Sequence, residues 1–259
     1  MTAPDERVEV RVSGAADRPT LVYLPGLHGD WTLIAGLRGA LRGRVRLVEL
    51  TYPRTLAWSL DHYAQGVAAA LRREGIAGGW LLGESFGSQV LWPLAANPGF
   101  HVEGIILAGG FTRHPMPWGA RLVAGMLRAC PLPCLRLGLR AYGAVARCRF
   151  GSAPEVAAGT REFIARRTRE DLQAILHRLR LVAENQPAAL LREVRVPVYA
   201  LTGWLDPIVP WFFVRPALRR DCRTLRAYRI LNGDHNVLNS APTQAARQII
   251  EWVGGDARP

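Results

Sequence analysis

Residues 83–87 (GESFG) carry a serine hydroxyl in a setting that favours nucleophilic chemistry. They follow an apolar run at 80–83 and precede a stretch of helical character at 86–96, which predicts a sharp turn from a strand into a helix. The two glycines allow such a turn with little steric clash. Backbone N–H groups at the start of a helix stabilise negative charge that develops nearby. We therefore predict that Ser85 is a nucleophile and that the adjacent Glu84 faces away from the site.

A serine hydroxyl needs a base to take its proton before it can attack a substrate. Among the six histidines, His235 is the best placed, because it follows a predicted strand and directly precedes the last predicted helix at 239–253. A histidine on a late loop at the edge of a sheet can reach over the nucleophile. We therefore predict that His235 is the general base.

The imidazole in turn needs an acid that fixes its tautomer and stabilises its cation. Asp206 directly follows the predicted strand at 196–202, and ligands bind at the carboxyl ends of strands in open α/β sheets. Asp234 is an alternative acid, although neighbours in sequence such as Asp234 and His235 rarely point their side chains at each other. We predict that Asp206 orients the histidine.

The elements around these residues indicate a mostly parallel sheet with helices on both faces. Short apolar runs alternate with amphipathic stretches, which is typical of βαβ units. Strands this apolar belong in a parallel sheet that is covered on both faces. Residues 7–13 alternate strictly and predict an edge strand, and the spacing at 60–73 predicts a helix. The other predicted strands are 20–24, 45–50, 80–83, 104–108, 196–202 and 224–231.

The pattern changes between Thr112 and Val194, where helical segments dominate and no strand pattern is evident. Prolines separate these segments. We predict an α/β core from residues 1–111 and 195–259, with an all-helical cap or lid inserted at 112–194. The predicted helices of the cap are 120–128, 135–147, 155–167 and 170–185.

The order of Ser85, Asp206 and His235, together with the GESFG context, resembles the α/β-hydrolase superfamily over residues 8–253. The resemblance implies the α/β-hydrolase fold. It also separates reaction types, because members that open epoxides or displace halide carry aspartate at the nucleophile position. Ser85 therefore favours acyl chemistry.

The resemblance further implies an oxyanion hole built from two backbone N–H groups. One belongs to the residue after the nucleophile, here Phe86. The other comes from the loop after an early strand, where residues 24–29 read LPGLHG. Many members have His-Gly at this point and this chain has Pro25-Gly26, so Leu27 is the expected donor and His28 is a second candidate.

The expected activity is hydrolysis of a carboxylic ester or thioester of a small, largely apolar substrate through an acyl-enzyme on Ser85, without a cofactor or metal ion. An acyltransferase with the same three residues, and a non-catalytic small-molecule binder on the same fold, are the alternatives. Four aromatic residues flank the predicted loops and are candidates for substrate binding, with core packing as the alternative for each: Trp31, Phe111, Trp118 and Trp204.

The net charge of +12 comes from 33 arginines, since the chain contains no lysine. Arginines spread over the whole chain favour a GC-rich coding bias over nucleic-acid binding, which usually uses basic clusters interleaved with aromatics. The region 112–194 nevertheless holds 14 arginines against six acidic residues, so it is either a solvated face or a surface that steers an anionic substrate or acidic partner.

The N-terminal sequence and the cysteine spacing bear on the expected compartment and on metal binding. Residues 1–18 contain no apolar run, and no stretch approaches the roughly 20 apolar residues that span a bilayer, so we expect a cytoplasmic protein without a membrane span. Of the four cysteines, Cys130 and Cys134 are spaced by Pro-Leu-Pro, which disfavours a zinc site. We expect the four cysteines to be buried free thiols.

Overall fold

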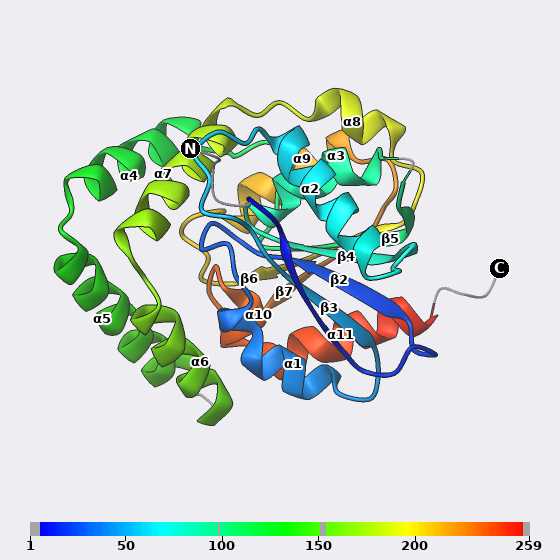
Figure 1. Cartoon of the computed structure of the whole chain (residues 1–259), viewed down its shortest axis with the longest axis horizontal. Coiled ribbons are helices and arrows are strands. Elements are labelled where there is room, and N and C mark those ends of the chain that lie inside the picture. The colour runs from blue at the N-terminus through cyan, green and yellow to red at the C-terminus, as the bar shows by residue number, and fades with distance from the viewer. Residues whose placement is uncertain (1–5, 98, 151–153, 256–259) are drawn as a thin grey trace.

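The computed structural model describes residues 6–97, 99–150 and 154–255, and within them a seven-stranded sheet forms the centre of the molecule (Figure 1). The strand order is β1-β3-β2-β4-β5-β6-β7. β1 pairs antiparallel with β3 at the edge, and the other pairs are parallel, so the predicted mostly parallel sheet is confirmed. The strands are β1 Glu9–Ser13, β2 Thr20–Leu24, β3 Arg46–Thr51, β4 Gly78–Glu84, β5 His101–Ala108, β6 Val198–Gly203 and β7 Leu225–Leu231.

Two hydrophobic cores lie on opposite faces of this sheet, because side chains alternate along each strand. In β2, Val22 and Leu24 belong to one core, whereas Leu21 and Tyr23 belong to the other. The first core packs against α2 (Leu60–Arg73) and α3 (Gly87–Ala95), and the second against α1 (Ala35–Leu41) and α11 (Pro242–Gly255). The predicted cover of helices on both faces is therefore confirmed.

The chain between β5 and β6 folds into helices only, within the part that the structure describes. Figure 1 shows four of them, α4 to α7, gathered at one end of the sheet, with α6 lying beside α1. We call α4–α8 the helical segment. Its members are α4 Pro117–Ala129, α5 Leu132–Phe150, α6 Pro154–Ala165, α7 Arg169–Glu184 and α8 Ala188–Glu193.

The helices differ from the sequence-based expectation in two ways. The helices α1, α8 and α9 (Trp211–Asp221) were not predicted, since α1 and α8 are short and α9 carries Pro216 in its interior. The predicted last helix is divided into α10 (Val237–Ser240) and α11. Pro242 starts α11, where a missing N–H costs nothing.

The expectation of four buried thiols is wrong. Only Cys222 is buried, against the core beneath α9, whereas Cys130 is partly exposed and Cys134 and Cys148 are exposed. The three accessible thiols lie at the end of α4 and along α5, which face solvent over much of their length. In the described ranges, no helix has both the length and the apolar character that crossing a bilayer requires.

Candidate active site

Ser85 lies in a strained turn between β4 and α3. Its φ of 48° is in the left-handed region, and no other described residue except glycine has a positive φ. Its N–H donates to the Ala108 carbonyl (3.0 Å), and its carbonyl accepts from the Ser88 N–H (3.0 Å), so hydrogen bonds on both sides hold the turn. A Cβ at Gly87 would collide with the backbone of β2, and this explains the second glycine of the GESFG motif.

The predicted nucleophile, base and acid come together at the carboxyl ends of the strands. His235 Nε2 lies 2.9 Å from the Ser85 hydroxyl oxygen, and His235 Nδ1 lies 2.9 Å from Asp206 Oδ2. All three residues are buried. Asp206 Oδ1 accepts the backbone N–H groups of Ile208 (2.9 Å) and Val209 (2.8 Å), which fix the orientation of the carboxylate. The result is a hydrogen-bonded row of hydroxyl, imidazole and carboxylate.

The protonation of His235 is governed by two opposed effects. Burial disfavours the imidazolium, but the charge and hydrogen bond of Asp206 outweigh it, and the pKa of His235 is raised above its ordinary value of 6.5. The carboxylate thus stabilises the cation that forms when the ring takes a proton.

Asp234 makes different contacts from those of Asp206. Its carboxylate accepts the hydroxyl of Tyr142 from α5 and the backbone N–H of Asn236 (3.0 Å). It makes no hydrogen bond to the His235 ring among the described residues, so the carboxylate bonded to the imidazole is that of Asp206.

The two expected oxyanion donors flank the serine and are unengaged. Among the described residues, the N–H groups of Leu27 and Phe86 donate no hydrogen bond to another protein group. The loop of Leu27 is closed by a hydrogen bond from the Gly29 N–H to the Gly26 carbonyl (3.0 Å). Two free N–H groups beside a nucleophile can receive a developing oxyanion.

Two buried arginines hold this loop, one between α6 and α7 and one in α7, and the sequence interpretation missed both. Arg167 contacts Asp30 through an ion pair and donates to the His28 carbonyl (3.2 Å). Arg178 donates to the Leu27 carbonyl (2.9 Å). For Arg178, the helical spacing of α7 was a usable signal, because this residue falls on the buried face of the helix. The buried residues that recur at this spacing are Asp171, Ala174, Arg178 and Val182.

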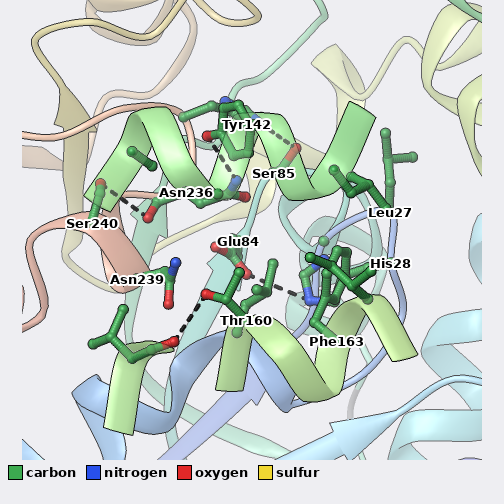
Figure 2. Close-up of a pocket in the computed structure, with 18 of the residues that line it drawn as sticks. Leu27, His28, Glu84, Ser85, Tyr142, Thr160, Phe163, Asn236, Asn239 and Ser240 are labelled. Atoms are coloured by element: carbon green, nitrogen blue, oxygen red, sulfur yellow. Dashed lines mark hydrogen bonds and ion pairs between the residues drawn. The ribbon is translucent and has the colours of Figure 1, made fainter. Parts of the chain in front are cut away.

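A largely apolar cavity of about 230 Å³ opens above Ser85 (Figure 2). Its floor comes from the loop of residues 26–28 and the turn at residues 84–85, and its walls come from α5, α6 and the loop of His235. Glu84 lines this cavity beside Ser85, so the expectation that it faces away is wrong. Its carboxylate accepts the hydroxyl of Tyr23 from β2, which holds it at this position. Apolar lining residues include Leu33, Leu139, Val156, Phe163, Ile164 and Ile175.

The four aromatic residues expected to bind substrate do not line this cavity. Phe111 is buried in the core, and its carbonyl accepts from Gln89 Nε2 (2.8 Å). Trp31 packs against the core on the other side of the sheet. Trp118 on α4 is 65% exposed, and Trp204 is 56% exposed and stacked on Trp211. Proximity to a loop in sequence does not fix the direction of a side chain, and this explains the difference.

Comparisons with known proteins bear on the fold. No family model matches the chain. It is 26% identical over 260 residues to a pimeloyl-[acyl-carrier protein] methyl ester esterase of Methylococcus capsulatus, covering 94% of this chain and 97% of the relative.

Solved structures match over almost the whole chain. An esterase from Exiguobacterium antarcticum superposes with a TM-score of 0.77 at 14% identity, covering 96% of both chains. An esterase from a Rhodococcus species superposes with a TM-score of 0.71 at 21% identity, covering 96% of this chain and 94% of the other. At these identities the likeness shows the fold, which is the α/β-hydrolase fold.

Proposed function

On the α/β-hydrolase fold that this chain adopts, we propose that the protein is a serine hydrolase that cleaves carboxylic esters through an acyl-enzyme on Ser85. The observation that carries the proposal is the hydrogen-bonded row at 2.9 Å and 2.9 Å from the hydroxyl of Ser85 through His235 to Asp206. This row opens into an apolar cavity, which suits an uncharged acyl group.

The proposed reaction has two halves. The Ser85 oxygen attacks the ester carbonyl while His235 Nε2 takes its proton, and the carbonyl oxygen becomes an oxyanion held by the N–H groups of Leu27 and Phe86. The tetrahedral intermediate collapses and expels the alcohol, which receives the proton from His235. Water then attacks the acyl-enzyme with His235 again as base, which releases the acid and restores the serine.

The cavity limits the substrate. A volume of about 230 Å³ admits a small acyl or alkoxy group, and its mostly apolar lining favours hydrocarbon over charge. The Methylococcus relative is named for a methyl ester, which supports an ester as the substrate class. A thioester fits the same chemistry, because its carbonyl reacts by the same steps.

We propose that residues 112–194 act as a cap on a core formed by 1–111 and 195–259. The helices α5 and α6 of this region form the walls of the cavity. A cap in this position shields the reacting carbonyl from bulk water and strengthens the hydrogen bonds around it.

The proposed function is tested with p-nitrophenyl esters of graded acyl length. Wild type is expected to hydrolyse short and medium esters, and Ser85→Ala to lose kcat by about 10⁴-fold or more, as triad serines do. Ser13→Ala, on the edge strand far from the site, is the matched control and should keep wild-type rates. A fluorophosphonate probe should label wild type and Ser13→Ala but not Ser85→Ala. Equal turnover by wild type and Ser85→Ala would remove the serine from the mechanism.

A further inference from the structure

Two residues that line the cavity each carry a buried side-chain polar atom without a hydrogen-bond partner within the described residues. These atoms are His28 Nε2 and Glu84 Oε1. The His28 side chain is 8% exposed and the Glu84 side chain is 1% exposed, so bulk solvent does not satisfy them. Buried polar atoms are nearly always paired, and an unpaired one costs about 1–3 kcal/mol. Two such atoms on neighbouring side chains that line one cavity point to a missing partner.

The surrounding contacts hold the pair apart. Glu84 Oε2 accepts the hydroxyl of Tyr23, and the His28 ring packs edge-on against Phe163, with ring centroids 5.6 Å apart. His28 Nε2 lies 4.0 Å from Glu84 Oε2, which is longer than a direct hydrogen bond. Figure 2 shows the two side chains directed toward each other beside Thr160.

The chemistry of the pair selects the group that fits between them. Burial lowers the pKa of His28, so the ring is neutral at pH 7 and offers one N–H. With that hydrogen on Nε2, the site presents one donor and one carboxylate acceptor. A hydroxyl accepts from the imidazole and donates to the carboxylate at once. A carbonyl or ether oxygen satisfies only the imidazole, and a carboxylate is repelled by Glu84.

We propose that His28 and Glu84 form a subsite for a hydroxyl group that the ester substrate carries close to its carbonyl. The position follows from the chain, because Glu84 directly precedes Ser85 at the end of β4 and both residues line the cavity. This inference rests on the proposed function, and it names the substrate class as hydroxy esters.

The test uses ester pairs that differ by hydroxyl against methyl. They are ethyl 3-hydroxybutanoate with ethyl 3-methylbutanoate, and ethyl 2-hydroxypropanoate with ethyl 2-methylpropanoate. Acid release is followed with a pH indicator. In wild type we expect kcat/KM to favour the hydroxyl member of at least one pair by about 10-fold or more, because a methyl leaves both polar atoms unpaired.

Three variants separate recognition from the intrinsic reactivity of the esters. Glu84→Gln keeps an oxygen that accepts the Tyr23 hydroxyl and places an amide N–H toward His28. The hydroxyl of the substrate then has no acceptor at this position. His28→Phe keeps a ring against Phe163 but removes the nitrogens. Both should reduce the hydroxyl-to-methyl ratio by about 10-fold. Thr160→Val is the matched control on the same wall, since its hydroxyl already donates to the Val156 carbonyl (2.9 Å), and its ratio should equal that of wild type.

Binding to Ser85→Ala distinguishes failure of the subsite from failure of the proposed function. Calorimetric titration with the same ester pairs should show tighter binding of the hydroxyl member, and the additional Glu84→Gln change should abolish the difference. If wild type cleaves no ester but this binding preference is present, the proposed function fails and the subsite stands. If the two members of each pair bind and react equally, or if the preference survives both Glu84→Gln and His28→Phe, the subsite is overturned and the atoms are paired by water only.

Discussion

The guanidinium of Arg178 donates from Nη1 to the carbonyl of Leu27 across 2.9 Å, and this bond joins α7 to the loop that carries an expected oxyanion donor. Its Nη2 donates to the Pro53 carbonyl (3.0 Å) and its Nε to the Tyr63 hydroxyl (3.3 Å). A Cβ at Gly29 would collide with this guanidinium, so the close contact between the loop and Arg178 requires glycine at this position. The position of the Leu27 N–H thus depends on a residue 151 positions away in sequence.

Arg178→Lys is expected to lower kcat by about 10- to 100-fold with a smaller change in KM. A lysine amine cannot reproduce the planar fork that serves three acceptors, and a displacement of about 1 Å at a catalytic group costs up to about 100-fold. Steady-state kinetics on a p-nitrophenyl ester measures both parameters. Arg180→Lys, exposed on the same helix and paired with Glu184, is the matched control and should behave as wild type. A variant that melts earlier but keeps its kcat would show that Arg178 acts on stability alone.

Asp206→Asn should reduce kcat by about 10⁴-fold, whereas Asp234→Asn should change it by less than about 10-fold. The first change removes the carboxylate bonded to His235 Nδ1 and favours the wrong tautomer. Asp234→Asn alters a carboxylate that accepts hydrogen bonds from the Tyr142 hydroxyl and the Asn236 N–H. The amide oxygen of asparagine can still accept one of these hydrogen bonds. Kinetics and circular dichroism of both variants check the expectation, and the opposite order would make Asp234 the acid.

The pH profile of wild type should have its acid limb above pH 6.5, because the raised pKa of His235 keeps the base protonated to higher pH. The rate rises as pH increases through this pKa, since only the neutral ring accepts the serine proton. The residual activity of Asp206→Asn should show its acid limb at lower pH, because burial then acts without the carboxylate. Measurements of kcat/KM from pH 5 to 9 test this shift, and coincident limbs in the two proteins would argue against His235 as the titrating base.

Asp30→Asn should destabilise the protein at neutral pH and progressively less in acid. Burial alone raises the pKa of this carboxyl, but His28 and Arg167 outweigh it and lower the pKa to about 2. The stability that the ion pair supplies is therefore complete above the ordinary carboxyl pKa of 3.8 and is lost as pH falls through about 2. Removing one partner of a buried pair costs about 3–5 kcal/mol.

Thermal unfolding at pH 7, 5 and 3 measures the difference in stability between wild type and Asp30→Asn as a difference in Tm. We expect the same gap in Tm at pH 7 and 5, and a smaller gap at pH 3. Asp17→Asn, in an exposed turn, serves as the control and should match wild type throughout. A gap that stays constant down to pH 3 would mean that the charge of Asp30 is not what stabilises the loop.

Local pattern was sufficient for the sheet and for selecting a serine, a histidine and an aspartate that lie within hydrogen-bond distance of one another in the structure. The apolar run of β2 and the helical spacing of α2 predicted both elements at their observed bounds, 20–24 and 60–73. The glycines around Ser85 reflect backbone contacts within a few residues and one neighbouring strand, so they leave a signal in a short window.

The cavity could not be predicted in this way, because its walls form when α5 and α6 pack over the carboxyl ends of the strands. Which side chains point inward depends on that packing, and so Trp118 is exposed while Phe163 lines the cavity. Arg178 was missed for a related reason, since an arginine is expected at the surface unless its distant partners are known.

The positive φ of Ser85 has a consequence for how this protein can change. A non-glycine residue in the left-handed region costs about 1–2 kcal/mol, and glycine at this position would remove the hydroxyl of the proposed nucleophile. Folding stability and the proposed activity therefore place opposite demands on residue 85. Selection for stability alone would favour glycine at this turn, and the resulting protein would be more stable but inactive.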